Sequence, residues 1–221
     1  MSGFSTARQK MVDGQVRPSD VTDIRILDAM LTVPRELFVP ENRRALAYLD
    51  LNLDISEGGS AKRFLIQPAV SAKMLQAADI KNTDNVLVAG CATGYTAALV
   101  ARIAARVTAT ETDPEHAAKA RDVLAQLGLE NVTFRAAAPG DGDPANAPYD
   151  VIVLDGATEI VPDRLYGQLA EGGRLVGIFA MTQPPRASIV TRFHGDFGNR
   201  PLFDASVPVL PGLERLPAFV F

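Results

Sequence analysis

The chain has 221 residues and a mass of 23.6 kDa, a length typical of one domain with a modest appendage. Hydrophobic residues make up 47% and charged residues 22%, which supplies a full core and argues against a disordered chain. The net charge of −4 comes from interspersed charges. This pattern excludes the basic stripe by which proteins bind nucleic acid.

The cysteine and histidine content limits the classes of site. The only cysteine, Cys91, excludes an internal disulfide framework and a multi-cysteine zinc site, and it favours a reducing compartment. We expect His116 on an exposed helix face and His194 at a strand end, neither with a metal-ligand partner, so no metal is predicted. No apolar stretch approaches the roughly 18 residues that span a bilayer, and no secretory leader is visible. The sequence predicts a cytoplasmic protein without membrane contact.

The first 80 residues read as helices joined by proline-marked turns. Asp23 precedes a helix over residues 24–31, and Pro34 follows its end. A second helix begins at Pro68, because proline fits the first turn of a helix.

Residues 85–180 alternate between apolar strands and helices. Gly128 is expected to cap one of these helices, another is expected to run through Leu165 and Leu169, and Gly172-Gly173 is expected to turn the chain into the last strand. The expected strands are 86–89, 107–110, 132–134, 150–154 and 175–179. Such apolar strands separated by helices predict a doubly wound α/β domain with a mostly parallel sheet covered on both faces.

From Ser188 onward the pattern is that of an antiparallel hairpin, with strands over 189–193 and 202–209 and a turn at 195–198. We therefore divide the chain into an N-terminal segment, residues 1–80, packed on an α/β domain, residues 81–221.

The strongest chemical signal is the turn after the first expected sheet strand. Gly90 and Gly94 flank this turn, and Glu111 ends the next strand 21 positions after Gly90 (from 90 to 111). A glycine turn and an acid about 20 residues later are typical of a nucleoside site, in which the acid accepts both ribose hydroxyls. The alternative is a plain tight turn and a solvated strand end. Ala92 and Tyr95 break the G-x-G-x-x-G spacing, which disfavours a nicotinamide cofactor.

Several other side chains have two interpretations. Asp155 either faces the site or caps the following helix, and Cys91 is either a cofactor-loop contact or a small buried thiol. Tyr48 and Asp50 either line a substrate cleft or simply pack.

The motifs, taken in order, resemble those of the protein-L-isoaspartate O-methyltransferases, class I enzymes that use S-adenosylmethionine. The matching motifs are Met11-Val12-x-x-Gln15-x-Arg17-Pro18, Val33-Pro34-Arg35-x-x-Phe38-Val39-Pro40, Ala47-Tyr48-x-Asp50, Gln67-Pro68, Val86 to Tyr95, Ala147-Pro148-Tyr149-Asp150 and Gln168-Leu169-x-x-Gly172-Gly173-Arg174-Leu175-Val176. The resemblance implies methyl transfer from S-adenosylmethionine to isoaspartyl carboxylates of damaged peptides or proteins, by a monomer or weak homodimer. The residues that it assigns to the cofactor are Gly90, Cys91, Ala92, Gly94, Tyr95, Glu111 and Asp155.

The sequence departs from the family pattern at positions that face the site. Ile66 stands where the family's active-site segment carries a serine, and that segment is longer here, with Ser56 and Ser60 as substitutes. In the cofactor loop Val88 replaces an acid, and Ala92 replaces a glycine, which is tolerable only if its φ is negative and the ligand leaves room. Gly140-Asp141-Gly142 is either the family's adenine-binding element in a shifted loop or a coincidence.

These departures leave two hypotheses and no assigned catalytic residue. The first is an active isoaspartyl methyltransferase, because a carboxylate needs no general base and alignment of two bound partners supplies most of the acceleration. The second is a degenerate member that binds an adenosyl ligand or a protein partner without this activity.

Overall fold

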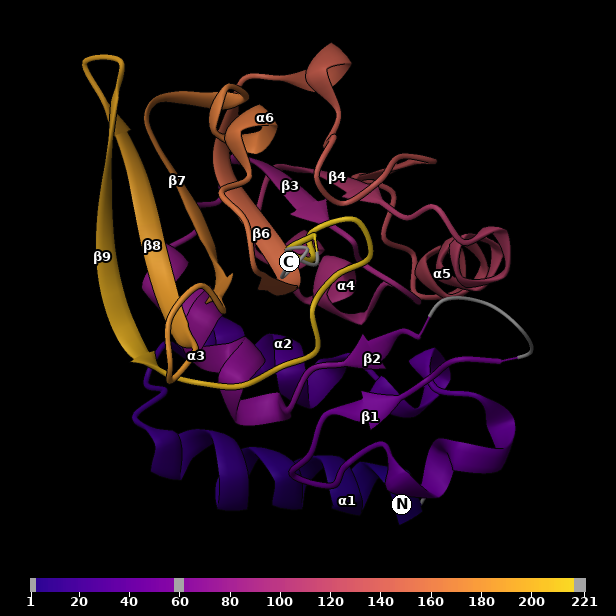
Figure 1. Cartoon of the computed structure of the whole chain (residues 1–221). Coiled ribbons are helices and arrows are strands. Elements are labelled where there is room, and N and C mark those ends of the chain that lie inside the picture. The colour runs from indigo at the N-terminus through magenta and orange to yellow at the C-terminus, as the bar shows by residue number, and fades with distance from the viewer. Residues whose placement is uncertain (1–2, 58–61, 217–221) are drawn as a thin grey trace, which may run out of the picture.

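The computed structural model describes residues 3–57 and 62–216. Its centre is a seven-stranded sheet in the order β5-β4-β3-β6-β7-β8-β9. The strands are β3 (Asn85–Ala89), β4 (Arg106–Thr110), β5 (Val132–Arg135), β6 (Tyr149–Thr158), β7 (Leu169–Phe179), β8 (Arg186–Phe193) and β9 (Asp196–Asp204). Strands β3 to β7 pair in parallel, and β8 and β9 add antiparallel strands at one edge, as the sequence predicts (Figure 1).

Helices surround this sheet. They are α3 (Pro68–Ala78), α4 (Tyr95–Ala101), α5 (Pro114–Gln126) and the short α6 (Asp163–Tyr166). Asp113 caps α5 by accepting hydrogen bonds from the amides of Glu115 and His116, and Gly128 takes a φ of +66° just beyond the helix end.

The N-terminal segment forms a helical layer below the sheet in Figure 1. It contains α1 (Gly3–Met11), α2 (Ile24–Thr32), the short helices η1 (Val12–Val16), η2 (Arg17–Ser19), η3 (Arg35–Phe38) and η4 (Glu41–Leu46), and the small β1–β2 pair (Leu53–Asp54 and Phe64–Leu65). One apolar core runs from Met11 through Val153 to Val207. The N-terminal segment and the sheet therefore share a single core.

Two local expectations were wrong. The helix expected through Leu165 and Leu169 ends at Tyr166, and Leu169 begins β7, with Gly172-Gly173 inside that strand. The hairpin turns at His194-Gly195, so residues 196–198 belong to β9, which ends at Asp204 rather than at 209. In both places strand pairing with a neighbour, which local patterns do not reveal, makes the strand begin earlier in the chain than expected.

After β9 the chain crosses the carboxyl ends of the central strands (Figure 1). Val209 forms a parallel bridge with Ala157, the amide of Ala157 donates to the Pro208 carbonyl, and the amide of Leu210 donates to the Ala157 carbonyl. We call residues 205–216 the C-terminal tail. It places new side chains directly over the edge of the sheet where α/β proteins bind ligands.

Candidate functional site

The loop between β3 and α4 is built as a tight turn that brings backbone close to the sheet edge. Gly90 and Gly94 have φ values of +73° and +92°, and the Gly94 amide donates to the Cys91 carbonyl. Ala92 also has a positive φ, +49°, so the condition set from the sequence for tolerating its methyl group is not met. A non-glycine residue in this region is strained by roughly 1–2 kcal/mol.

Glu111 follows β4 and faces this loop. Its Oε2 accepts hydrogen bonds from the Ala92 amide at 2.8 Å and from the Arg63 guanidinium, and its Oε1 accepts from the amides of Thr112 and Asp113. Glu111 as a whole is 1% exposed, which rules out the solvated strand end considered as an alternative. The sequence identified the acid, and the structure supplies its partners.

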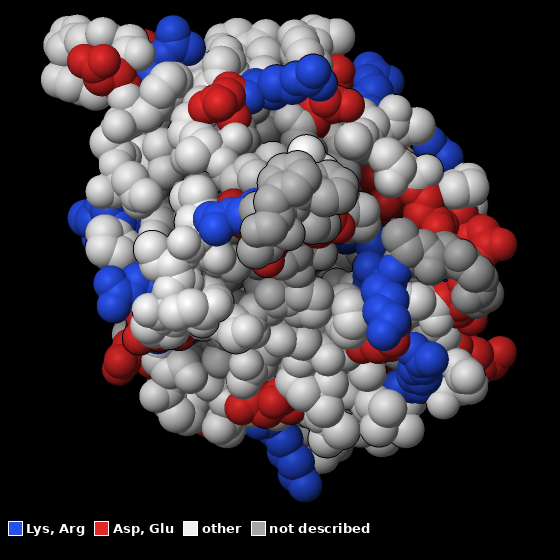
Figure 2. Space-filling model, viewed as in Figure 1, with Lys and Arg blue, Asp and Glu red and all other residues white. Residues whose placement is uncertain are grey.

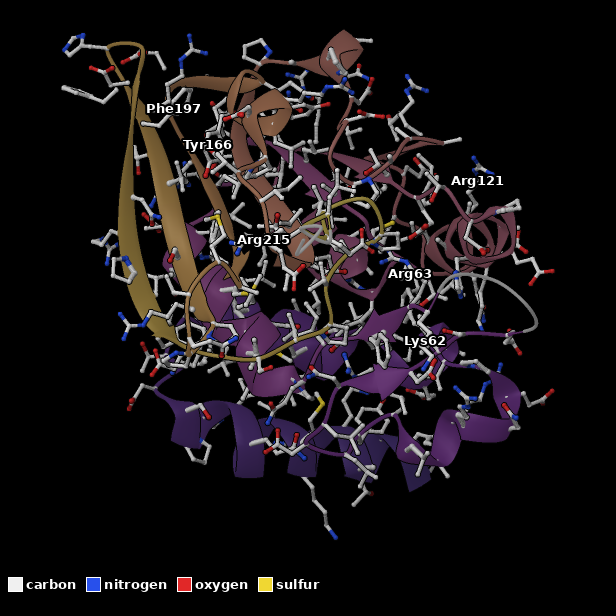
Figure 3. All side chains as sticks on the ribbon, viewed as in Figure 1. Lys62, Arg63, Arg121, Tyr166, Phe197 and Arg215 are labelled. Atoms are coloured by element: carbon white, nitrogen blue, oxygen red, sulfur yellow. The ribbon has the colours of Figure 1, made fainter. Side chains whose placement is uncertain are left out.

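Arg63 is the partner that sequence reasoning missed. Its Nε and Nη2 atoms both donate to Glu111, and Nη2 also donates to the Gly90 carbonyl at 2.6 Å. Figure 3 shows Arg63 between β2 and the loops that follow β3 and β4. A signal was present, because Lys62 and Arg63 form a basic pair directly before the apolar run Phe64-Leu65-Ile66. Because Arg63 lies in a segment longer than the family's, it could have been identified from the sequence as a candidate site residue.

Asp155 lies inside β6 rather than at a strand end, and it caps no helix. Its Oδ1 accepts a hydrogen bond from Thr96 Oγ1 at 2.8 Å. Burial raises the pKa of this carboxyl to about 6, while the Thr96 hydroxyl and the charges of Arg63 and Arg35 act in the opposite direction. Arg63, which pairs with Glu111, thus also acts to lower the pKa of Asp155.

The remaining loop residues are buried. Cys91 is 0% exposed and burial raises the pKa of its thiol, which fits a small core side chain. The Tyr95 ring lies 4.6 Å below the guanidinium of Arg35. Arg35 Nη2 in turn donates to the Ile66 carbonyl, so this buried arginine holds the segment that carries Ile66 and Gln67.

The segment expected to hold an active-site hydroxyl is only partly described. Ser60 lies outside the described residues. The Ser56 hydroxyl accepts a hydrogen bond from the Arg63 amide at 2.8 Å. The Ile66 side chain is 4% exposed and offers no polar atom. Among the substrate-cleft candidates, Tyr48 donates to Glu36, and Asp50 accepts from the side-chain Nε2 of Gln67 at 2.7 Å.

The other sequence candidates lie away from this group. Asp141 pairs with Arg164, beside a groove of about 280 Å³ that Gly140 and Leu213 also line. His116 is 4% exposed, so its expected exposure was wrong: its Nε2 lies 3.4 Å from the carbonyl of Ile55, in the N-terminal segment. His194 lies exposed in the hairpin turn.

Within residues 3–57 and 62–216, no group of three or more His, Cys, Asp or Glu side chains could hold a metal ion, and no helix is long and apolar enough to cross a membrane. Basic and acidic side chains are interspersed on the face shown in Figure 2.

The arrangement does not accommodate an adenosyl group as it stands. Both carboxylate oxygens of Glu111, which would accept the ribose hydroxyls, are already engaged by protein N–H groups. Leu210 of the C-terminal tail packs on Gly90 of the cofactor loop and on Gly156, which follows Asp155: a Cβ on Gly90 would lie 3.0 Å from Leu210 Cδ2, and one on Gly156 would lie 2.5 Å from Leu210 Cγ. The predicted site residues are together in space, but the chain itself fills the space between them.

Comparison with known proteins identifies the family. The model of the family described as protein-L-isoaspartate(D-aspartate) O-methyltransferase matches residues 6–185. Relatives named protein-L-isoaspartate O-methyltransferase include one from Methanoculleus marisnigri, 40% identical over 169 residues, covering 76% of this chain and 75% of that protein. Another, from Koribacter versatilis, is 41% identical over 176 residues, covering 80% and 78%.

Solved structures agree with this match. A protein-L-isoaspartate O-methyltransferase superposes with a TM-score of 0.83 at 25% identity, over 94% of this chain and 67% of that chain. A Plasmodium falciparum protein described by the same activity, in complex with S-adenosyl-L-homocysteine, superposes with a TM-score of 0.76 at 16% identity, over 95% and 99%, and supports the fold. The first likeness extends through the N-terminal helical layer, not only the sheet. The chain belongs to the protein-L-isoaspartate(D-aspartate) O-methyltransferase family.

Proposed function

We propose that the chain is an S-adenosylmethionine-dependent carboxyl methyltransferase that forms methyl esters on isoaspartyl residues of damaged peptides and proteins. The observation that carries the proposal is the family match over residues 6–185, which includes both the N-terminal segment and the loops around Glu111. Relatives about 40% identical over three quarters or more of this chain are named for this activity.

The proposed substrate suits the residues that are present. An isoaspartyl carboxylate is ionised at neutral pH, so it is a nucleophile without a general base. The chain has to align two bound partners and exclude water. Arg35 contributes to alignment, because its hydrogen bond to the Ile66 carbonyl fixes the segment before Gln67.

The proposed cofactor contacts are those assigned from the resemblance: Gly90, Cys91, Ala92, Gly94, Tyr95, Glu111 and Asp155. We further propose that the protein acts in the cytoplasm, as a monomer or weak homodimer, and that residues 1–80 and 81–221 divide substrate and cofactor binding between them.

The test is a methyl-transfer assay with S-adenosylmethionine and two peptides of one sequence, one with an isoaspartyl and one with an aspartyl linkage. We expect base-labile methyl esters on the isoaspartyl peptide alone. Equal labelling of both peptides would contradict the proposed substrate, and no labelling at saturating cofactor would contradict the activity.

Ile66 allows a sharper version of this assay. Ile66→Ser restores a hydroxyl at the family's serine position, and Ile66→Ala removes similar volume without a hydroxyl. Because one hydrogen bond contributes roughly 1 kcal/mol, we expect Ile66→Ser to turn over isoaspartyl peptide about fivefold faster than Ile66→Ala. Equal rates would show that no hydroxyl is needed at this position.

A second candidate function follows from the filled site. Arg63 on Glu111 and Ile66 in the serine position favour a family member kept for binding rather than turnover. Retention of the isoaspartyl peptide without labelling in the same assay would support it.

A further inference from the structure

Two segments that are far apart in the chain meet where the family places its cofactor. Arg63 comes from the segment before β2, and Leu210 comes from the C-terminal tail. Neither belongs to the loops of the α/β domain that carry the predicted cofactor contacts. Both nevertheless contact Gly90, through its carbonyl and its α-carbon side respectively.

Arg63 provides the same kind of hydrogen bonds that a ribose would provide. Glu111 Oε2 receives N–H donors from Arg63 in place of hydroxyl donors. The side chains of this pair are 4% and 2% exposed, so water does not compete for either partner. A buried carboxylate without a partner would destabilise the folded state, and the Arg63 guanidinium offsets that penalty.

Leu210 closes the site near the carboxyl end of β6. The hydrogen bond from its amide to the Ala157 carbonyl, at 2.9 Å, fixes the tail along the end of β6. Its side chain, 2% exposed, then lies against Gly90 and Gly156, where the absence of a Cβ permits close approach. Gly90, which would admit a ligand, admits this leucine instead.

We propose that Arg63 and Leu210 are internal occupants of the nucleoside site, and that an adenosyl ligand binds only by displacing them. This inference rests on the proposed function and says what regulates it. The affinity for the cofactor is set by competition with the chain's own side chains. A ligand whose binding-competent state is a minor population binds with an affinity reduced by that population.

The test is a calorimetric titration of the full chain with S-adenosylhomocysteine. The variants are Arg63→Gln, which removes the charge and keeps a polar chain, and Leu210→Ala. Lys62→Gln is the matched control, because Lys62 is exposed next to Arg63 and loses the same charge (Figure 3). We expect Arg63→Gln and Leu210→Ala each to bind at least about tenfold tighter than wild type, while Lys62→Gln binds as wild type does.

Equal affinities for Arg63→Gln, Lys62→Gln and wild type would overturn the proposal, as would weaker binding by Arg63→Gln, which would make Arg63 a ligand contact. Circular dichroism verifies that each variant is folded. Should Arg63→Gln fail to fold, Leu210→Ala decides alone, because its tail lies outside the central strands.

Methyl transfer to the isoaspartyl peptide separates this proposal from the function on which it rests. If wild type methylates the peptide and the variants bind the cofactor as wild type does, the proposal that Arg63 and Leu210 occupy the site is overturned. The proposed methyltransferase activity then stands. Tighter binding by the variants without turnover at saturating S-adenosylmethionine supports the internal occupants and overturns the activity. No binding by any variant overturns both.

Discussion

Glu111 and Arg63 do not contribute equally to the stability of the pair they form. Without Arg63, Glu111 still accepts hydrogen bonds from three backbone amides, those of Ala92, Thr112 and Asp113. Without a carboxylate at 111, the buried Arg63 retains only the Gly90 carbonyl among its acceptors from the cofactor loop. We therefore expect substitutions of the two residues to lower the free energy of unfolding by different amounts.

We expect Glu111→Gln to lower the free energy of unfolding by about 3–5 kcal/mol, the cost of leaving a buried charge without its partner. Arg63→Gln should cost about 1–3 kcal/mol, the value of charge-assisted hydrogen bonds. Urea denaturation of both single variants and the double variant measures these costs and the coupling between them. A larger loss for Arg63→Gln than for Glu111→Gln would contradict this assignment.

Asp155 predicts a pH dependence. Its pKa is raised to about 6 from a usual 3.8, so the folded state holds a proton that the unfolded state has released between these values. Unfolding is therefore favoured progressively as the pH rises from about 4 to about 6, by up to about 3 kcal/mol, and this penalty is absent below about pH 4.

Asp155→Asn is neutral at every pH and keeps an oxygen for Thr96, so its stability advantage over wild type should grow from pH 4 to 6 and then stay constant. Denaturation at several pH values measures it. Asp196→Asn, on the exposed start of β9, is the control and should differ from wild type by the same amount throughout. An advantage for Asp155→Asn that is independent of pH would contradict the prediction.

The elements show which parts of the fold local patterns can predict. Strands β3, β4 and β5 were predicted to within a residue or two, because continuous apolar runs between glycine and helix signals leave few alternatives. β6 and β7 extend beyond the expected ranges: β6 continues because Ala157 pairs with both β7 and the tail, and β7 begins early because Leu169 pairs with Tyr149. His116 was expected on an exposed face, but the N-terminal segment covers it. These errors share one cause, namely contacts between residues distant in sequence.

The same reason limited prediction of the site. Glu111 was predicted from a spacing within one βαβ unit, whereas its contact with Arg63 joins residues 48 positions apart. The position of Leu210 over Gly90 depends on the path of the whole tail.

The C-terminal tail is held to the sheet edge by few bonds, and Leu210 is its apolar anchor beside Leu213. Leu210→Ala removes most of that anchor, a loss of roughly 2–5 kcal/mol for a buried leucine. We expect the amides of Leu210 and Glu159, which pair with Ala157 and Leu213, to exchange hydrogen at least tenfold faster in the variant.

Hydrogen exchange followed by mass spectrometry measures this change. Amides in the centre of β3 should be affected less, because they pair with β4 and β6 rather than with the tail. Equal acceleration in β3 and the tail would show that Leu210 stabilises the whole sheet.

At the scale of the whole molecule, the N-terminal segment and the sheet are joined by more than apolar contact. Arg174 in β7 donates to the carbonyls of Ala78 and Asp79 at the end of α3 and pairs with Asp84 at 3.0 Å. Together with the shared core, this predicts one cooperative unfolding transition.

Site-resolved hydrogen exchange in low denaturant tests that prediction. The slowest amides of α2, in the N-terminal segment, and of β6, in the sheet, should report the same free energy of opening and the same denaturant dependence. A distinctly lower free energy for α2 would show that residues 1–80 unfold on their own.

Cys91 is an internal probe for the uncovering of the loop between β3 and α4. The thiol is the only one in the chain, it is 0% exposed, and it lies in the loop whose first glycine contacts both Arg63 and Leu210. An alkylating reagent can reach it only when this loop is uncovered, so the rate of alkylation reports the fraction of molecules in which the loop is open. Mass spectra recorded during alkylation would thus follow access to the sheet edge in the wild-type protein, without a chromophore or an engineered site.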